Sequence, residues 1–144
     1  PNSLMRRASR TAAPLRFWIP TEFDGDSHYC KAQRIKSDIE KDEDYASLGY
    51  QIFRIPYFVQ ITTPVLKSIF NEDITFEQRY PNGFIDNKAV LPSDFCELGI
   101  ELFKNDLVRF EYHAEEIIES LKEKIKEKGD TELVVPPSIL EKIV

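Results

Sequence analysis

Residues 15–30, LRFWIPTEFDGDSHYC, carry the strongest structural signal in this chain. Residues 15–24 are rich in aromatic and β-branched side chains, so they predict an extended strand with Pro20 at an edge or a break. Alternation along a strand places Glu22 and Asp24 on one face, about 7 Å apart, just before the chain turns at Gly25. Two carboxylates at an open strand end are suitable ligands for a divalent cation such as Mg²⁺, which prefers oxygen ligands and keeps several waters.

The segments that follow predict an alternation of helix and strand. Residues 31–48 carry apolar side chains at near-helical spacing with charges between them, and the predicted helix ends at Gly49. These apolar side chains are Ile35, Ile39, Tyr45, Ala46 and Leu48. Residues 50–61, YQIFRIPYFVQI, predict an apolar strand that ends or bends at Pro56, and residues 62–64 predict the start of another helix. The order strand, helix, strand, helix indicates an α/β domain.

The rest of the chain predicts loops and helices. Residues 71–92 contain turn-forming residues and no regular period. Ser93 is expected to cap a helix through Phe103, and a longer helix is expected over residues 106–128, before Gly129. The tail predicts a short extended piece and then a helical turn. We expect a flexible leader at 1–14 and a single domain at 15–144, with a core motif at 15–60 and a helical extension at 61–144.

Composition limits the class of protein. With 144 residues, of which 42% are hydrophobic, the chain can form one core. No window approaches the roughly 18 apolar residues of a membrane span, so we expect a soluble, cytoplasmic protein with no membrane contact. The net charge of -6 speaks against nonspecific coating of nucleic acid, but a nuclease needs clustered carboxylates and is not excluded. Cys30 and Cys96 match no zinc spacing and are expected to be reduced and structural.

Three further residues near the carboxylate pair could carry chemistry. His28, just past the turn, could bind a water or a scissile phosphate or act as a general base, although a single histidine after a turn is more often exposed. Asp38 borders the buried face of the predicted helix and could look back toward Glu22. Arg54 lies inside an apolar strand, where an unpaired guanidinium is costly, so it either pairs with a carboxylate or faces a phosphate.

These residues resemble the Vsr-like (very-short-patch-repair) branch of the PD-(D/E)XK nuclease superfamily. The matching text is EFDGDSHY, RIKSDIEKDEDYASLGY and QIFRIPYF, where the family's motif positions hold Glu22, Asp24, Gly25, His28, Asp38, Gly49 and Arg54. The resemblance covers about residues 15–60 and implies a restriction-endonuclease-like α/β core that cleaves DNA with Mg²⁺ or Mn²⁺. It also implies that Glu22 and Asp24 bind the metal and act in catalysis with His28, Asp38 and Arg54.

One departure from the family pattern leaves a second interpretation open. The family has an acidic residue in a strand ahead of Glu-x-Asp-Gly, whereas here LRFWIPT leads almost directly into that motif and carries Trp18. The chain is therefore either an active endonuclease or a truncated or degenerate, catalytically inactive nuclease-fold domain that acts as a protein-interaction module. In the second case, helices within residues 94–128 would bind a protein partner, and a homodimer is one way to complete the site.

Overall fold

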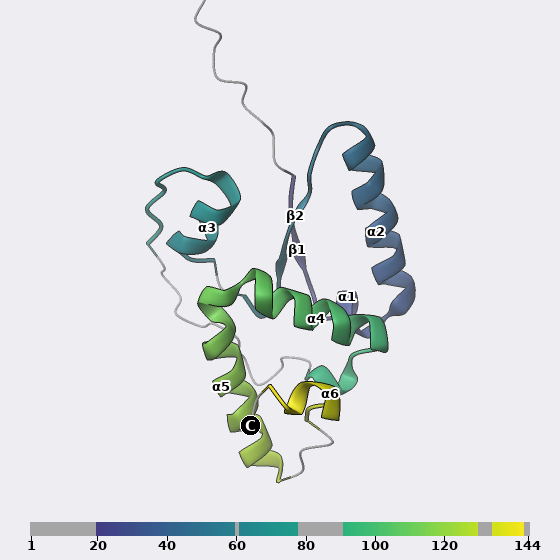
Figure 1. Cartoon of the computed structure of the whole chain (residues 1–144), viewed down its shortest axis with the longest axis vertical. Coiled ribbons are helices and arrows are strands. Elements are labelled where there is room, and N and C mark those ends of the chain that lie inside the picture. The colour runs from purple at the N-terminus through teal and green to yellow at the C-terminus, as the bar shows by residue number, and fades with distance from the viewer. Residues whose placement is uncertain (1–19, 60, 78–90, 130–133, 143–144) are drawn as a thin grey trace, which may run out of the picture.

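The computed structural model of this chain describes residues 20–59, 61–77, 91–129 and 134–142. Strands β1 (Thr21–Asp24) and β2 (Phe53–Pro56) lie side by side (Figure 1). They pair in parallel, with Glu22 opposite Arg54. The connection between them runs through α1 (Ser27–Cys30) and α2 (Ala32–Ser47). Two parallel strands need a long crossover of this kind, because both must start at the same end of the sheet. The first part of the described chain is therefore a β-α-β unit.

Helices form most of the remaining described chain. Helix α3 (Thr63–Phe70) follows β2, and the 3-10 turn η1 (Pro92–Asp94) leads into α4 (Glu97–Arg109), α5 (Glu111–Lys128) and the short α6 (Pro137–Leu140). Helix α4 packs against both α1 and α2, and α5 turns away from it (Figure 1). The fold is mixed α/β and mostly helical, with a small two-stranded parallel sheet. No helix within these residues is long and apolar enough to cross a membrane.

Aromatic side chains form the centre of the core. Tyr29 of α1 stacks on Phe95 with ring centroids 4.9 Å apart, and Phe58 meets Phe103 of α4 edge-on at 5.1 Å. Buried aliphatic side chains from α3, α5 and α6 pack around these rings: Val65, Ile69, Ile117, Leu121 and Ile139. The core thus holds α1, which follows the carboxylate pair, firmly against the helical part of the chain.

Several predicted elements are confirmed, with shifted boundaries. The helix predicted at 31–48 is α2, and Gly49 follows it with a φ of 84°, a conformation that favours glycine. The strand predicted at 50–61 is confined to β2. The helix expected to begin at Ser93 begins at Glu97, because Ser93 belongs to η1. The two long helices are separated at Phe110, not between residues 103 and 106.

Other predictions lie outside the described residues. They concern the leader at 1–14, the first part of the strand at 15–19 with Trp18, residues 78–90 of the expected irregular segment, and part of the tail at 130–133. Within the described tail, the predicted helical turn is confirmed as α6.

The prediction of which face of α2 is buried is wrong in part. Ile35 is buried as expected. Three apolar side chains expected on the buried face are exposed: Ile39, Ala46 and Leu48. Helix α2 instead turns Asp38 and Asp42 toward Arg54 of the sheet. The physical reason is that the neighbouring face of the sheet is charged, so the helix meets it with charged side chains.

Candidate functional site

The register of the two strands brings the predicted site residues to the side of the sheet that faces α2. Glu22 and Asp24 alternate with Phe23, whose side chain is 60% exposed. Strand β2 places Arg54 opposite Glu22, and α2 brings Asp38 to the same place. The prediction that the two carboxylates of β1 share one face is confirmed, because both contact the same atom of Arg54.

The guanidinium of Arg54 lies at the centre of the site. Its Nη1 atom is 3.0 Å from Asp24, 3.2 Å from Glu22 and 3.6 Å from the Asp38 carboxylate. Its Nη2 atom donates a hydrogen bond to Asp42 at 2.7 Å, and Nε donates to the same carboxylate at 3.1 Å. Of the two alternatives for Arg54, the structure shows pairing with carboxylates.

Burial and charge act in opposite directions on these groups. Burial alone would lower the pKa of Arg54, but the hydrogen bond to Asp42 and the nearby negative charges raise it overall, so Arg54 remains a cation. Burial raises the pKa of Asp24, although the charge of Arg54 opposes this shift. The pKa of Glu22 is lowered, chiefly by the hydrogen bond from Lys41. Asp24 and Glu22 therefore differ in how readily they take up a proton.

His28 is buried against the carboxylates, so the interpretation of an exposed histidine is wrong. Its side chain is held by α1, and only 7% of the residue is exposed. The Nδ1 atom lies 2.5 Å from Asp38 and 3.4 Å from Asp24, and Nη2 of Arg34 lies 3.3 Å from Nε2. A guanidinium only donates, so Nε2 accepts and Nδ1 carries the proton that is donated to Asp38. This arrangement fixes the orientation of the imidazole.

The structure adds three residues of α2 to the site, Arg34, Lys41 and Asp42, of which sequence reasoning missed Lys41 and Asp42. Lys41 forms an ion pair with Glu22, and Arg34 lies 3.8 Å from Asp38. Their spacing could have identified them, because residues three and four positions from Asp38 share its face of the helix. With them, the site holds four carboxylates, three basic side chains and His28.

The carboxylates converge on an arginine. Among the residues that the structure describes, no group of three or more His, Cys, Asp or Glu side chains is arranged to hold a metal ion. The point that Glu22, Asp24 and Asp38 share is the position of Arg54 Nη1. The donors are nevertheless carboxylate oxygens, which a hard divalent cation prefers. The chemical type of these side chains therefore suits a metal ion, but the ion would have to replace the contacts that the guanidinium of Arg54 now makes.

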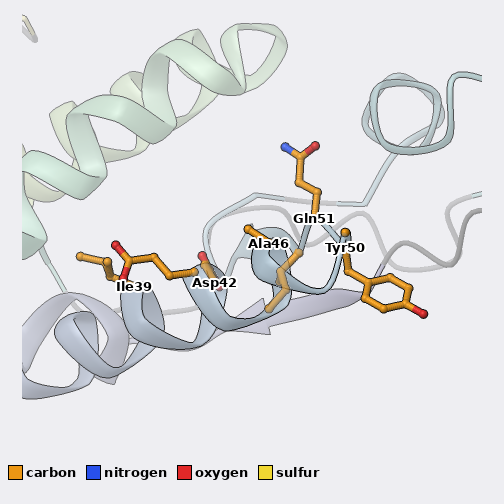
Figure 2. Close-up of a pocket in the computed structure, with 8 residues that line it drawn as sticks. Ile39, Asp42, Ala46, Tyr50 and Gln51 are labelled. Carbon is orange, nitrogen blue, oxygen red and sulfur yellow. The ribbon is translucent and has the colours of Figure 1, made fainter.

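A pocket of about 700 Å³ lies beside the site, at the C-terminal half of α2. It is lined by Ile39, Asp42, Glu43, Ala46, Gly49, Tyr50, Gln51 and Ile52. Figure 2 shows Asp42 on the helix and Tyr50 and Gln51 on the segment that leads to β2. Asp42 belongs to both features, since its carboxylate binds Arg54. The lining contains carboxylates and no basic side chain, so this pocket is poorly suited to a phosphate.

A second buried carboxylate, Asp106 of α4, lies in the core and was not identified from the sequence. It accepts a hydrogen bond from the Tyr29 hydroxyl at 2.7 Å and lies 3.0 Å from Nη2 of Arg109. Arg109 also donates to the backbone carbonyl of Arg54 at 2.6 Å and covers the ring of Phe110. Burial raises the pKa of Asp106 to about 6. This network connects α1, α4 and β2.

Comparisons with known proteins give no relative for this chain. No model of a protein family matches it, and neither a curated protein nor a solved structure does so. The family resemblance therefore rests on the motif residues, and the functional argument rests on the geometry of the site.

Proposed function

We propose that this chain is a metal-dependent phosphodiester hydrolase, a cytoplasmic endonuclease acting on DNA with a restriction-endonuclease-like core. One observation carries the proposal. Carboxylate oxygens of Glu22, Asp24 and Asp38 lie within 3.0–3.6 Å of a single atom, Nη1 of Arg54. A largely buried point at which three carboxylates already surround one positive charge also favours a divalent cation. The β-α-β unit brings these side chains to one side of the sheet, where they could share an ion.

The residues take distinct roles in this proposal. Glu22 and Asp24 hold Mg²⁺ or Mn²⁺, while Arg54 gives up its contacts with them. Bound there, the ion would polarise a phosphodiester and lower the pKa of an attacking water. Asp38 orients His28 through the Nδ1 hydrogen bond, which leaves Nε2 as the ring atom that can accept a proton.

Basic side chains near the site would receive the nucleic acid. The Arg34 side chain is 54% exposed, so it can leave His28 and donate to a phosphate. Lys31 and Lys36 are also exposed, beside and within the N-terminal part of α2. Together these three residues would neutralise phosphates next to a site that is itself acidic. Arg34 thus connects the proposed proton acceptor with the proposed DNA-binding surface.

A second candidate is a catalytically inactive nuclease-fold domain that binds a protein partner or a second copy of itself. The observation in its favour is that Arg54 and Lys41 already pair with the carboxylates of β1. Large apolar side chains are also exposed on the last long helices, with Val108 72% and Tyr112 66% exposed. In this alternative, Arg54 is a permanent structural replacement for a metal.

Metal binding and DNA cleavage separate the two candidates. Mg²⁺ and Mn²⁺ would be titrated into the full chain while Tm is followed, because an ion that binds only the folded state raises Tm. Cleavage of single-stranded and double-stranded DNA would be measured with the same ions. The test variant is Asp24→Asn. The matched control is Asp44→Asn, which removes an exposed carboxylate of α2 outside the site.

We expect the ions to raise Tm and support cleavage in the wild type and in Asp44→Asn, and to do neither in Asp24→Asn. Circular dichroism would verify that each variant is folded. A wild type whose Tm is unchanged by the ions and which cleaves no DNA contradicts the enzyme proposal and favours the interaction domain. Cleavage that persists in folded Asp24→Asn would remove this carboxylate from the mechanism.

A further inference from the structure

Two half-buried cysteines lie near each other where α1 ends and α4 begins. Cys30 is the last residue of α1, and Cys96 directly precedes α4. The carbonyl oxygen of Tyr29 accepts a hydrogen bond from the Cys96 N–H at 3.0 Å and another from the Cys96 Sγ–H at 3.3 Å. Covalent geometry places that oxygen about 3 Å from Cα of Cys30, so the two cysteine Cα atoms are at most about 7 Å apart. Disulfides span Cα separations of roughly 4.4–6.8 Å.

The surrounding packing holds this arrangement in place. The residues just before the two cysteines, Tyr29 and Phe95, stack with ring centroids 4.9 Å apart, and both are buried. One turn into α4, a Cβ atom at Gly99 would lie only 1.8 Å from the Tyr29 carbonyl oxygen. The start of α4 can approach α1 this closely because residue 99 is glycine. The backbones of the two cysteines are therefore held near each other by the fold and not by chance encounters of mobile segments.

We propose that Cys30 and Cys96 form a redox modification site, at which a low-molecular-weight disulfide oxidises the two thiols to a disulfide joining α1 to α4. The thiolate of one cysteine attacks the reagent R–S–S–R, forms a mixed disulfide and releases R–S⁻. The thiolate of the other cysteine then attacks the protein sulfur of that mixed disulfide and releases the second R–S⁻. Two protein thiols are oxidised, the reagent is reduced to two thiols, and the protons pass to the released thiolates.

The surroundings of the two thiols indicate which one reacts first. Burial raises the pKa of Cys30, and the negative charges of Asp26 and Asp94 raise it further. Since the thiolate is the attacking species, Cys30 is a poor first nucleophile at neutral pH, and Cys96 makes the first attack. Cys30 then closes the bond, because the mixed disulfide lies beside it. This order predicts that Cys96 alone accepts the small thiol efficiently.

The test is a redox titration of the full chain in mixtures of oxidised and reduced glutathione. Intact mass under non-reducing conditions would report the loss of two hydrogen atoms, and peptide mapping would locate the bond. Cys30→Ser and Cys96→Ser are the matched variants, with circular dichroism to verify that each is folded. The same titration in concentrated urea measures how far the fold promotes the bond.

We expect the disulfide between Cys30 and Cys96 to form in the folded wild type at a ratio of reduced to oxidised glutathione at least about tenfold higher than in urea. The oxidised protein should have a Tm roughly 5–10 °C above that of the reduced protein. Cys30→Ser should keep a mixed disulfide with glutathione on Cys96, and neither variant should show the rise in Tm. Stable glutathione adducts on both cysteines of the folded wild type would overturn the proposal. Disulfides that form only between chains, or equally well in urea, would also overturn it.

Discussion

Asp24 and Asp106 are both buried carboxylates bound by an arginine, but they lie in surroundings of opposite character. Asp106 lies in the aromatic core, where the Tyr29 hydroxyl and Arg109 bind it and no other carboxylate makes contact among the described residues. Asp24 shares Arg54 with three other carboxylates: Glu22, Asp38 and Asp42. Burial raises the pKa of both aspartates.

The difference lies in the number of charges. A lone carboxylate with one arginine and one hydroxyl is a satisfied polar group, which is what a folded core requires. The four carboxylates around Arg54 are met by only two further basic side chains, Arg34 and Lys41, so one carboxylate is in excess of what pairing requires, and each added negative charge repels the others. An excess of like charge that the fold maintains is typical of a site that binds a cation or positions a proton. This difference is why the proposed function involves Asp24, whereas Asp106 is a paired carboxylate of the core.

The largest effect is expected from removing the arginine of the acidic site. Arg54→Met leaves the carboxylates without their shared partner, so we expect the free energy of unfolding to fall by about 3–5 kcal/mol in the presence of EDTA. If the carboxylates can hold a divalent cation, Mn²⁺ should restore part of that loss, because it replaces the missing positive charge. Urea unfolding with and without the ion measures both quantities.

Arg109→Met is the matched control for this substitution. It also removes an arginine from a buried carboxylate, but among the described residues no other carboxylate pairs with Arg109 to complete an ion site. We expect a loss of stability that Mn²⁺ does not restore. Equal behaviour of the two variants would contradict the distinction between the sites, whether Mn²⁺ restores both or neither.

A smaller effect is expected in the pH dependence that Asp106 confers. Its pKa is about 6 in the folded protein, against an ordinary value of 3.8, so the folded state retains a proton that the unfolded state has released. The contribution of Asp106 to the free energy of unfolding should therefore fall as pH rises from 3.8 to about 6. The total loss is on the order of 2–3 kcal/mol.

Asp106→Asn should remove this part of the pH dependence. Tyr29 and Arg109 contact different oxygens of Asp106. The amide oxygen of asparagine can still accept from Arg109 while its NH2 donates to the Tyr29 hydroxyl oxygen, so the fold is expected to persist. Urea unfolding at several pH values between 4 and 7 would compare the variant with the wild type, and the other titrating groups contribute equally to both. Parallel curves for the two proteins would show that Asp106 remains ionised in the core throughout.

The sequence predicted the acidic site better than it predicted how α2 packs. Residue types and a strand period of two were sufficient for Glu22 and Asp24, because parallel pairing carries that local pattern directly into the structure. The packing of α2 could not be obtained this way. An apolar stripe predicts burial only where the facing surface is apolar, and here that surface is charged. Asp106 could not be predicted, because Tyr29 lies far from it in the sequence and approaches only in the folded chain.

The smallest effect tests whether the carboxylates of α2, and not its apolar side chains, attach this helix to the sheet. Ile39 is 51% exposed, so Ile39→Gln should change the free energy of unfolding by less than about 0.5 kcal/mol. Ile35 of the same helix is 6% exposed, and Ile35→Ala should cost about 2–4 kcal/mol through the loss of buried contacts. Urea unfolding of both variants gives the comparison. A loss above about 1 kcal/mol for Ile39→Gln would mean that the apolar stripe of α2 is covered, either by another part of this chain or by a second copy.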